Sequence, residues 1–414
     1  MLDSPAMSVV ERIYRHNTGR DPDLVTRKYA RLASDPFLFL RGTCHLFYAD
    51  WRGGRMLDSA PRAWICGDLH LENFGSYKGD NRLAYFDLND FDEAALAPCT
   101  WEIARLLVSL HVARRSLGFD LREARALTRC FLDHYTAALA DGKARWVERL
   151  LARGMIGELL RQVELRKRRD FLDQRTERDG KRRRLLIDGV KLIALEKSER
   201  EDLLAWCEKF AQRQDDPKFY RPVDAARRAA GTGSLGLTRY AILVRGAGSP
   251  RGNWILDMKI AGDSAAGKRL ARAQPAWPDE ATRIVNVQQH AQAIAPAFLK
   301  SVRYADRAFV LKELQPSQDR LDLASVNGAV RPLSGAIGAM GQLVAWSALR
   351  GCARGNAAKA DELVAFAQDR AWQRPLVQYV EDYSRQVVAD WREFRAAWQD
   401  GKRGEVRKRA RSGK

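Results

Sequence analysis

The stretch CGDLHLENFG, residues 66–75, decides how the rest of this sequence is interpreted. It places Asp68 and Asn73 five residues apart. A short distance downstream, YFDLNDFDEA adds three further carboxylates, those of Asp87, Asp90 and Asp92. Short strand-like runs surround these residues, so the polar side chains fall on neighbouring loops. Carboxylate and amide oxygens placed in this way can orient an attacking hydroxyl and hold Mg²⁺ against phosphates, as phosphoryl transfer requires.

The same residues also allow a purely structural interpretation. Asp68 and Asn73 can cap turns, and NDFDE can cap the helix that is predicted to begin near Thr100. For an isolated D-x-x-x-x-N this interpretation is the better one, because aspartate and asparagine are common turn residues. A second motif is needed to choose between the two.

That second motif lies in GTGSLGLTRYAILV, where Gly231, Gly233 and Gly236 have G-x-G-x-x-G spacing and Ser234 stands among them. The glycines fall between two predicted strands rather than before a helix, as a phosphate-covering hairpin requires. Lys259, in WILDMKIAG on the next strand, is spaced to reach the same phosphates. Taken alone, Lys259 would be an ordinary strand lysine with its stem along apolar surface.

Together these motifs resemble the protein kinase-like superfamily. GDLHLEN and NDFDE are similar to its catalytic and metal-binding loops, in the form found in aminoglycoside and choline phosphotransferases, while GTGSLG and LDMKIA resemble its glycine-rich loop and lysine strand. Segments from FLFLRG to FVLKELQPSQDRL, which span most of residues 36–350, are similar to the uncharacterised bacterial family called domain of unknown function 2252 (DUF2252). That family is grouped with the kinase-like fold.

The resemblance implies a role for each matching residue. Asp68 is expected to be the catalytic base, and Asn73 and Asp90 the Mg²⁺ ligands, with Asp87 and Asp92 as alternatives to Asp90. The residues expected to bind ATP are Gly231, Gly233, Ser234, Gly236 and Lys259 at the phosphates, with the backbone near Glu313 to Gln315 as the adenine-binding hinge.

Two further residues are candidate accessories to the site. Arg41 lies within the apolar segment FLFLRGTCHLF, where a buried guanidinium needs a partner, either a site carboxylate, a phosphate or an acidic core residue. His70 stands where many kinases carry lysine, or it packs within the loop. The helix after Lys259 offers no convincing glutamate partner for the lysine, because Glu280 lies at its start and the central positions are Gln288 and Gln289.

The predicted fold is α+β, a two-lobed kinase-like fold in circularly permuted order, because Asp68 precedes Gly231 by over 160 residues. Residues 1–185 would form the first part of a large helical lobe, 186–320 a small β-rich nucleotide-binding lobe, 321–400 the remainder of the large lobe, and 401–414 a basic disordered tail. Residues 8–60 are predicted to be mostly helical and 161–186 to form a helical hairpin turning at Asp179 and Gly180.

Composition adds broad limits. The 414 residues are 46% hydrophobic and 30% charged, and no apolar run is long enough to span a bilayer. The N-terminus lacks the pattern of a secretory signal and the six cysteines form no close pair, so a reduced, cytoplasmic protein is expected. A formal charge of +19 allows polyanionic partners, yet the basic stretches lack interleaved aromatic residues, so solvated surface is favoured over a nucleic-acid site.

These observations lead to one functional hypothesis and two alternatives. The hypothesis is an ATP- and Mg²⁺-dependent phosphotransferase acting on an unidentified hydroxyl-bearing substrate. The first alternative is a protein that also binds a nucleotide but does not transfer its terminal phosphate, either a nucleotide-binding pseudokinase or a nucleotidyl (AMP) transferase. The second alternative is a basic protein that binds nucleic acid or a protein partner without catalysis.

Overall fold

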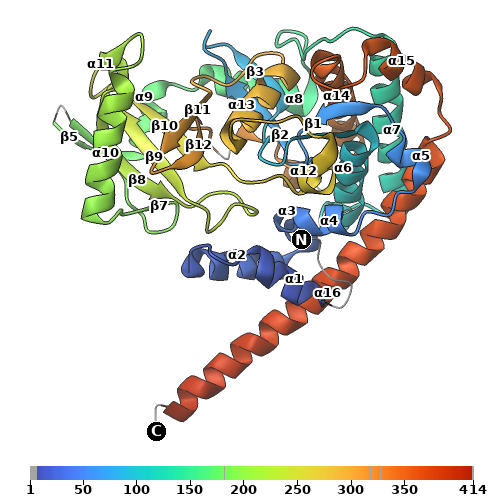
Figure 1. Ribbon diagram of the computed structural model, residues 1–414, viewed down its shortest axis with the longest axis horizontal. Coiled ribbons are helices and arrows are strands. Elements are labelled where there is room, and N and C mark those ends of the chain that lie inside the picture. The colour runs from blue at the N-terminus through green and yellow to red at the C-terminus, as the bar shows by residue number, and fades with distance from the viewer. Residues whose placement is uncertain (1–6, 181, 317–318, 327, 413–414) are drawn as a thin grey trace.

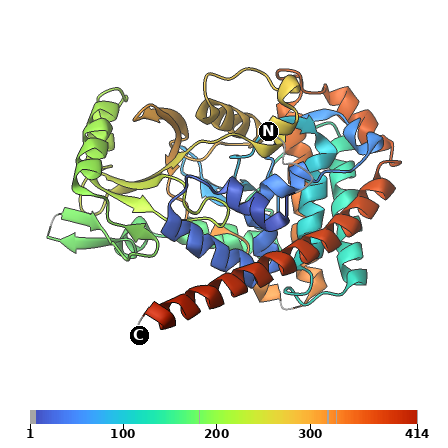
Figure 2. The ribbon, with the colours of Figure 1, turned by 60° about the horizontal axis from the view of Figure 1, so that its bottom comes forward.

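The computed structural model describes residues 7–180, 182–316, 319–326 and 328–412. The protein has a mixed α+β fold in which a curled antiparallel sheet lies to one side of a larger, mainly helical part (Figure 1). A long C-terminal helix runs along the helical part and projects beyond it (Figure 2).

The N-terminal segment is helical, as the sequence predicts. It forms α1 (Val9–His16), α2 (Pro22–Ser34), α3 (Pro36–Gly42), α4 (Cys44–Ala49) and α5 (Arg55–Asp58). Ser8, Asp21 and Asp35 begin the first three of these helices, because each side chain accepts a hydrogen bond from a free backbone N–H of the first turn.

Four short strands follow and carry the loops of interest between them. These strands are β1 (Arg62–Ile65), β2 (Phe74–Lys78), β3 (Ala84–Leu88) and β4 (Ala95–Pro98). β1 pairs with β4, and β2 pairs with β3, both antiparallel. Two polar loops, residues 66–73 and 89–94, therefore leave this region side by side.

The helical part is built around α6 (Cys99–Ala113), whose fifteen residues are all buried. The other large helices are α7 (Leu121–Ala140), α8 (Gly154–Leu165), α14 (Val330–Gly351), α15 (Ala360–Gln368) and α16 (Gln373–Ser412). α14 packs along α7, and α16 packs against α6 and α2. The tail that the sequence predicts to be disordered is helical as far as Ser412.

The prediction of a helical hairpin over 161–186 is wrong. α8 ends at Leu165, α9 (Arg168–Asp173) follows, and a β-hairpin of β5 (Thr176–Asp179) and β6 (Arg182–Leu185) takes the place of the second helix. The reason is a two-residue period, because Arg183 and Leu185 are buried while their neighbours are exposed. The buried Arg183 is satisfied by Asp173 at 2.6 Å and by the Thr176 hydroxyl at 2.8 Å.

The main sheet has six strands in the spatial order β11-β12-β10-β9-β8-β7. Their bounds are β7 (Leu192–Ile193), β8 (Pro222–Arg228), β9 (Arg239–Val244), β10 (Trp254–Ile260), β11 (Lys300–Tyr304) and β12 (Arg307–Glu313). Helices α10 (Lys197–Ala211) and α11 (Pro217–Tyr220) lie before β8, while α12 (Ala265–Arg269) and α13 (Glu280–Ala291) lie between β10 and β11.

The two faces of this sheet differ in chemistry. One face is apolar and packs on α10, where Tyr240, Ile242, Leu256 and Met258 surround Leu203. The alternate residues of the same strands point to the other face, which is turned toward the loops that follow β1 and β3. That second face carries the charged residues of the site.

No helix in the described part of the chain combines the length and the apolar character needed to cross a membrane.

Candidate functional site

Two adjoining cavities lie between the charged face of the sheet and the polar loops. The outer cavity has a volume of about 420 Å³ and the inner cavity about 150 Å³. The residues that line both of them are Asn73, Asp90, Asp92, Gly231, Ser234, Lys259 and Arg320. Asp68 lines the outer cavity. Residues separated by more than 150 positions in the sequence are thus brought to one place.

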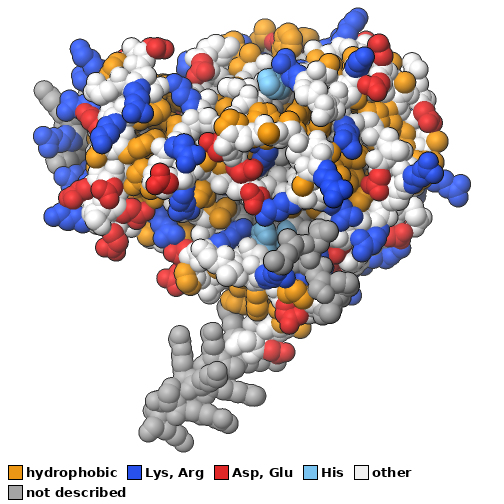
Figure 3. Space-filling model, in the orientation of Figure 1, with side chains coloured by type: hydrophobic (Ala, Val, Ile, Leu, Met, Phe, Trp, Pro, Cys, Tyr) orange, Lys and Arg blue, Asp and Glu red, His pale blue; other side chains and the backbone are white. Residues whose placement is uncertain are grey.

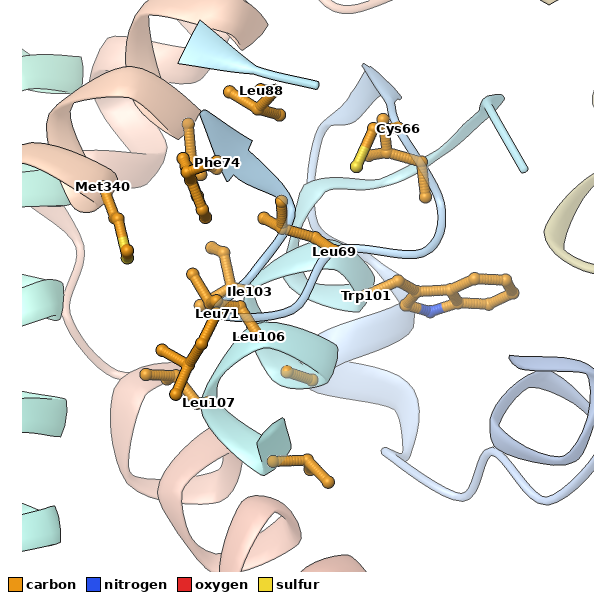
Figure 4. Packing of buried hydrophobic residues seen from close by; sticks show 14 of the residues in the cluster. Cys66, Leu69, Leu71, Phe74, Leu88, Trp101, Ile103, Leu106, Leu107 and Met340 are labelled. Carbon is orange, nitrogen blue, oxygen red and sulfur yellow. The ribbon is translucent and has the colours of Figure 1, made fainter. Parts of the chain in front are cut away.

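The loop at 66–73 is anchored by alternating apolar side chains. Leu69 and Leu71 are fully buried and point into the cluster formed with Ile103 and Leu106 of α6 (Figure 4). Asp68 directly precedes Leu69 and lines the outer cavity instead. Burial of the large apolar side chains that follow Asp68 thereby helps to fix its position.

Gly67 is required by the contact between the two polar loops. Its φ is +83°, and a Cβ on it would lie 1.9 Å from the Glu93 carbonyl oxygen. Any side chain at position 67 would push the loop 66–73 away from the loop 89–94. The glycine before Asp68 therefore allows the two candidate loops to meet.

Asp68 is held by an arginine that sequence reasoning missed. Arg105 of α6 donates to Asp68 Oδ1 from Nε at 2.7 Å and also from Nη2, and its Nη2 donates to the Leu40 carbonyl at 3.0 Å. Burial raises the pKa of the Asp68 carboxyl, and the charge of Arg105 opposes this shift. An arginine among the apolar residues of WEIARLLVSL was a detectable sign, by the same reasoning that selects Arg41.

Glu102, one helical turn before Arg105, supports the start of the same loop. Its Oε1 accepts a hydrogen bond of 2.6 Å from the Cys66 backbone N–H. Burial raises the pKa of Glu102 to about 7, because the hydrogen bonds from Cys66 and Gly67 only partly offset the loss of hydration. Helix α6 thus holds the start of the loop at both Cys66 and Asp68.

The raised pKa of Glu102 predicts a pH effect on stability. A carboxyl whose folded pKa lies above its unfolded value stabilises the fold below the unfolded pKa of about 4.5, and this contribution is lost as pH rises through about 7. Glu102→Gln keeps the acceptor but has no charge, so we expect it to be more stable than wild type at pH 8 by on the order of 1–3 kcal/mol. Urea unfolding at pH 5 and pH 8 measures the difference, and equal differences at both values would contradict it.

The Asn73 side chain is oriented so that its amide oxygen is available to bind a metal ion. Its Nδ2 donates to the Asp68 carbonyl at 3.1 Å and to the Asp90 carbonyl at 3.3 Å. The amide nitrogen is therefore directed at backbone oxygens of both loops, and the opposite atom, Oδ1, is the one left for a ligand.

Asp90 is the carboxylate best suited to join Asn73. Burial alone would raise the pKa of Asp90, but the nearby charges of Lys259 and Lys312 bring it below its usual range, so the group is ionised. Asn73 Oδ1 and the Asp90 carboxylate are two hard oxygen ligands, and Mg²⁺ bound to a nucleotide takes its remaining ligands from phosphates and water. Asn73 and Asp90 therefore fit Mg²⁺ that is bound to a nucleotide. No cluster of three or more His, Cys, Asp or Glu side chains suited to a metal occurs among the described residues.

The other two aspartates have separate partners. Asp87 lies away from both cavities, where it accepts hydrogen bonds from the backbone of Leu88 and Ala293 and pairs with Arg350 at 3.3 Å. Asp92 pairs with Lys259. The partner of Lys259 therefore comes from the loop after β3.

Helix α13 supplies no carboxylate to Lys259. Glu280 at its start pairs with Arg283 at 2.6 Å. Gln288, in the middle of the helix, lines the inner cavity and is 1% exposed. In the described structure the carboxylate that pairs with Lys259 is that of Asp92.

The glycine-rich segment forms the loop between β8 and β9. Gly231 and Gly236 have φ of +77° and +86°, which glycine adopts without strain. The Gly233 carbonyl accepts hydrogen bonds from Arg20 Nη1 at 2.8 Å and Lys28 Nζ at 3.0 Å. Ser234 uses its hydroxyl within the loop, donating to the Ala230 carbonyl at 2.9 Å. The N-terminal helices thus hold the loop over the outer cavity.

Arg41 and His70 form a small buried polar group that lines the outer cavity. Arg41 pairs with Glu72 and donates from Nε to His70 Nε2 at 3.3 Å. Burial lowers the pKa of His70 far below its usual range, and the charge of Arg41 adds to the shift, so the ring is neutral. Arg41 therefore has an acidic partner while its guanidinium still lines the cavity.

The segment expected to bind adenine is only partly directed at this site. The Glu313 side chain pairs with Arg82 at 2.9 Å and lines a separate cavity of about 290 Å³. Gln315 lines both that cavity and the inner one. The structure thus brings Gln315 to the site but directs the Glu313 side chain away from it.

Comparison with known proteins gives one match. The family model described as "Uncharacterized protein conserved in bacteria (DUF2252)" matches residues 20–397. No curated protein matches the chain, and no solved structure does either.

Proposed function

We propose that this protein, which belongs to the bacterial DUF2252 family, is an ATP- and Mg²⁺-dependent transferase of kinase-like fold that acts on a hydroxyl-bearing substrate. One observation carries the proposal. The same pair of cavities is lined by four features: an aspartate on an anchored loop, an Asn–Asp pair suited to Mg²⁺, a strand lysine and a glycine-rich loop. Capping of turns alone gives no reason for these segments to converge.

The strand arrangement supports the kinase-like part of the proposal. Along the chain, β8, the glycine-rich loop, β9, the lysine strand β10, helix α13, β11 and β12 follow one another, and in space β12 lies between β10 and β11. This is the order expected for a small nucleotide-binding lobe with its helix after the lysine strand. The loops containing Asp68 and Asp90 precede it in sequence, so the proposal includes a circular permutation.

The proposal gives each residue of the candidate site a separate role. Asp68 would orient and accept the proton of the attacking hydroxyl through Oδ2, since Oδ1 is bonded to Arg105. Asn73 and Asp90 would hold Mg²⁺, which neutralises charge on the phosphates when bound. Lys259 would bind phosphate oxygens, with Asp92 holding its ammonium group in place.

A nucleic-acid-binding function has less support. On the face shown in Figure 3, lysine and arginine side chains are spread among acidic ones rather than gathered into a stripe. A continuous basic track is what a polyanion backbone needs.

Nucleotide binding is the first test. Mg-ATP at 100 times its Kd should raise the free energy of unfolding by about 2.7 kcal/mol, and Lys259→Met should weaken the binding about tenfold or more by removing a phosphate contact. Thermal denaturation with and without Mg-ATP measures both effects. Lys209→Met, on the exposed side of α10, is the matched control and should behave as wild type. An unchanged melting temperature at millimolar Mg-ATP would overturn the proposal.

A further inference from the structure

We propose that the nucleotide binds this site with its polyphosphate in the inner cavity and its base outward, so that the transferred group is the nucleotidyl group and pyrophosphate leaves. This inference rests on the proposed nucleotide site and specifies its chemistry. It comes from the charge and the hydrogen-bonding groups of the inner cavity, which suit phosphate and not a purine base.

The inner cavity is lined by an excess of cations. Its positively charged residues are Arg228, Arg239, Lys259, Lys312 and Arg320, and its negatively charged residues are Asp90, Asp92 and Asp257. Asp257 is already paired with Arg228 at 2.8 Å and with Arg239. Asp92 pairs with Lys259. Asp90 is then the one carboxylate of this lining left for Lys312 and Arg320, so the five cations exceed the three carboxylates by two.

Lys312 is the cation most available to a ligand. It lies opposite Asp257 in the register of β12 and β10, but no described residue makes a hydrogen bond or an ion pair with its ammonium group. Burial lowers the pKa of Lys312 to about 8, while Asp90 and Asp257 oppose the shift. The group is thus mostly charged at neutral pH and faces a cavity without a direct partner.

Two amide groups reinforce this preference for an acceptor ligand. The Nε2 atoms of Gln288 and Gln315 are buried, and neither has a hydrogen-bond partner among the described residues. Both residues line the inner cavity, and Gln288 is 1% exposed. Buried donors without partners are costly, and phosphate oxygens, which only accept, would satisfy them together with Lys312.

A base in the inner cavity would find few suitable contacts. The backbone N–H groups of Glu313 and Leu314 already donate to the carbonyls of Ala297 and Ile255, both at 2.9 Å. The Gln315 carbonyl accepts from Arg228 at 3.5 Å. Burying a purine against Asp257 and Lys312 would also strip these charges of hydration without replacing it. The segment at the end of β12 therefore offers few free hydrogen-bonding groups to recognise adenine.

The outer cavity is the better place for the nucleoside. Its volume of about 420 Å³ falls within the range of small-molecule sites. Asp68 lines only this outer cavity, whereas Asn73, Asp90 and Lys259 line both cavities. With the terminal phosphates inside, the α-phosphate would lie at the junction, next to the residues proposed to bind Mg²⁺ and within reach of an acceptor on the Asp68 side.

The resulting step is a balanced substitution at phosphorus. The acceptor hydroxyl oxygen forms a bond to the α-phosphorus, and the bond from the α-phosphorus to the α,β-bridging oxygen breaks. The hydroxyl proton passes to Asp68 and then to solvent, and pyrophosphate leaves into the inner cavity. In the opposite orientation the γ-phosphate would lie at the junction, and ADP would be the product.

Binding of partial ligands tests the orientation first. We expect inorganic tripolyphosphate with Mg²⁺ to raise the melting temperature of wild type, adenosine to leave it unchanged, and Lys312→Met to weaken tripolyphosphate and Mg-ATP binding about tenfold each. Lys209→Met is the control and should match wild type. Stabilisation by adenosine together with an unaffected tripolyphosphate affinity in Lys312→Met would overturn the inference.

Product analysis provides the second measurement and needs only wild type. With ATP labelled at the α- or the γ-phosphate, slow reaction with water or with the protein's own hydroxyls should release pyrophosphate and leave the α-label in AMP or on protein. Release of ADP and phosphate, with Mg-ATP bound, would overturn the orientation and leave the proposed function standing. Failure of Mg-ATP to bind at all would overturn both.

Discussion

Replacing Asp68 by asparagine should lower turnover of Mg-ATP by about 10²- to 10⁴-fold, the range typical of losing a general base, while nucleotide affinity stays near wild type. Asparagine keeps an oxygen that can accept from Arg105 but cannot take a proton from the acceptor hydroxyl. Because Asp68 lines only the outer cavity, its loss should leave the Mg²⁺ and phosphate contacts intact.

The controls for Asp68→Asn separate catalysis from folding and from metal binding. Glu72→Gln alters a carboxylate of the same loop that pairs with Arg41, and it should retain most of the activity. Asp90→Asn should weaken Mg²⁺-dependent nucleotide binding as well as turnover, because it removes a proposed metal ligand. Product formation per folded molecule is the readout. Equal turnover in wild type and Asp68→Asn, with nucleotide bound, would favour the pseudokinase alternative.

Local patterns in the sequence were sufficient to select most of the residues that line the candidate site. The polar loop at 66–73, the loop with Asp90 and the strand with Lys259 each have a signature within about ten residues, because turn chemistry and strand alternation are short-range effects. The burial of Arg41 with an acidic partner also follows from the cost of placing an isolated charge among apolar residues.

Pairings between distant segments could not be predicted in this way. Asp92 and Lys259 are far apart in sequence. The three aspartates of this region look equivalent in the sequence until tertiary packing pairs Asp92 with Lys259 and Asp87 with Arg350. The β5–β6 hairpin was missed because charged residues in RRRL obscure a two-residue period that appears only when Arg183 is seen to be buried. The high charge of this stretch predicts that all its arginines lie on the surface, whereas in the structure Arg183 is buried and paired with Asp173.

Arg105 is the residue whose loss should cost the most stability. It is fully buried, and it bonds both Asp68 and the Leu40 carbonyl. Arg105→Met would remove the buried guanidinium and leave the partly buried Asp68 carboxylate without its cation, so we expect the free energy of unfolding to fall by about 3–5 kcal/mol. Urea denaturation measures this loss. Arg125→Met, which removes the exposed pair with Glu381, is the matched control and should cost no more than about 1 kcal/mol.

A double variant shows whether the cost comes from the unpaired charge or from lost packing. If the charge dominates, Asp68→Asn combined with Arg105→Met should be less destabilised than the sum of the two single variants, because neither partner is then left ionised alone. A double variant whose loss equals that sum would contradict the pairing as the cause. The same pair of residues then explains why an arginine is buried in α6: its guanidinium, which is fully buried, holds the proposed base in place from inside the core, while the Asp68 carboxylate still lines the outer cavity.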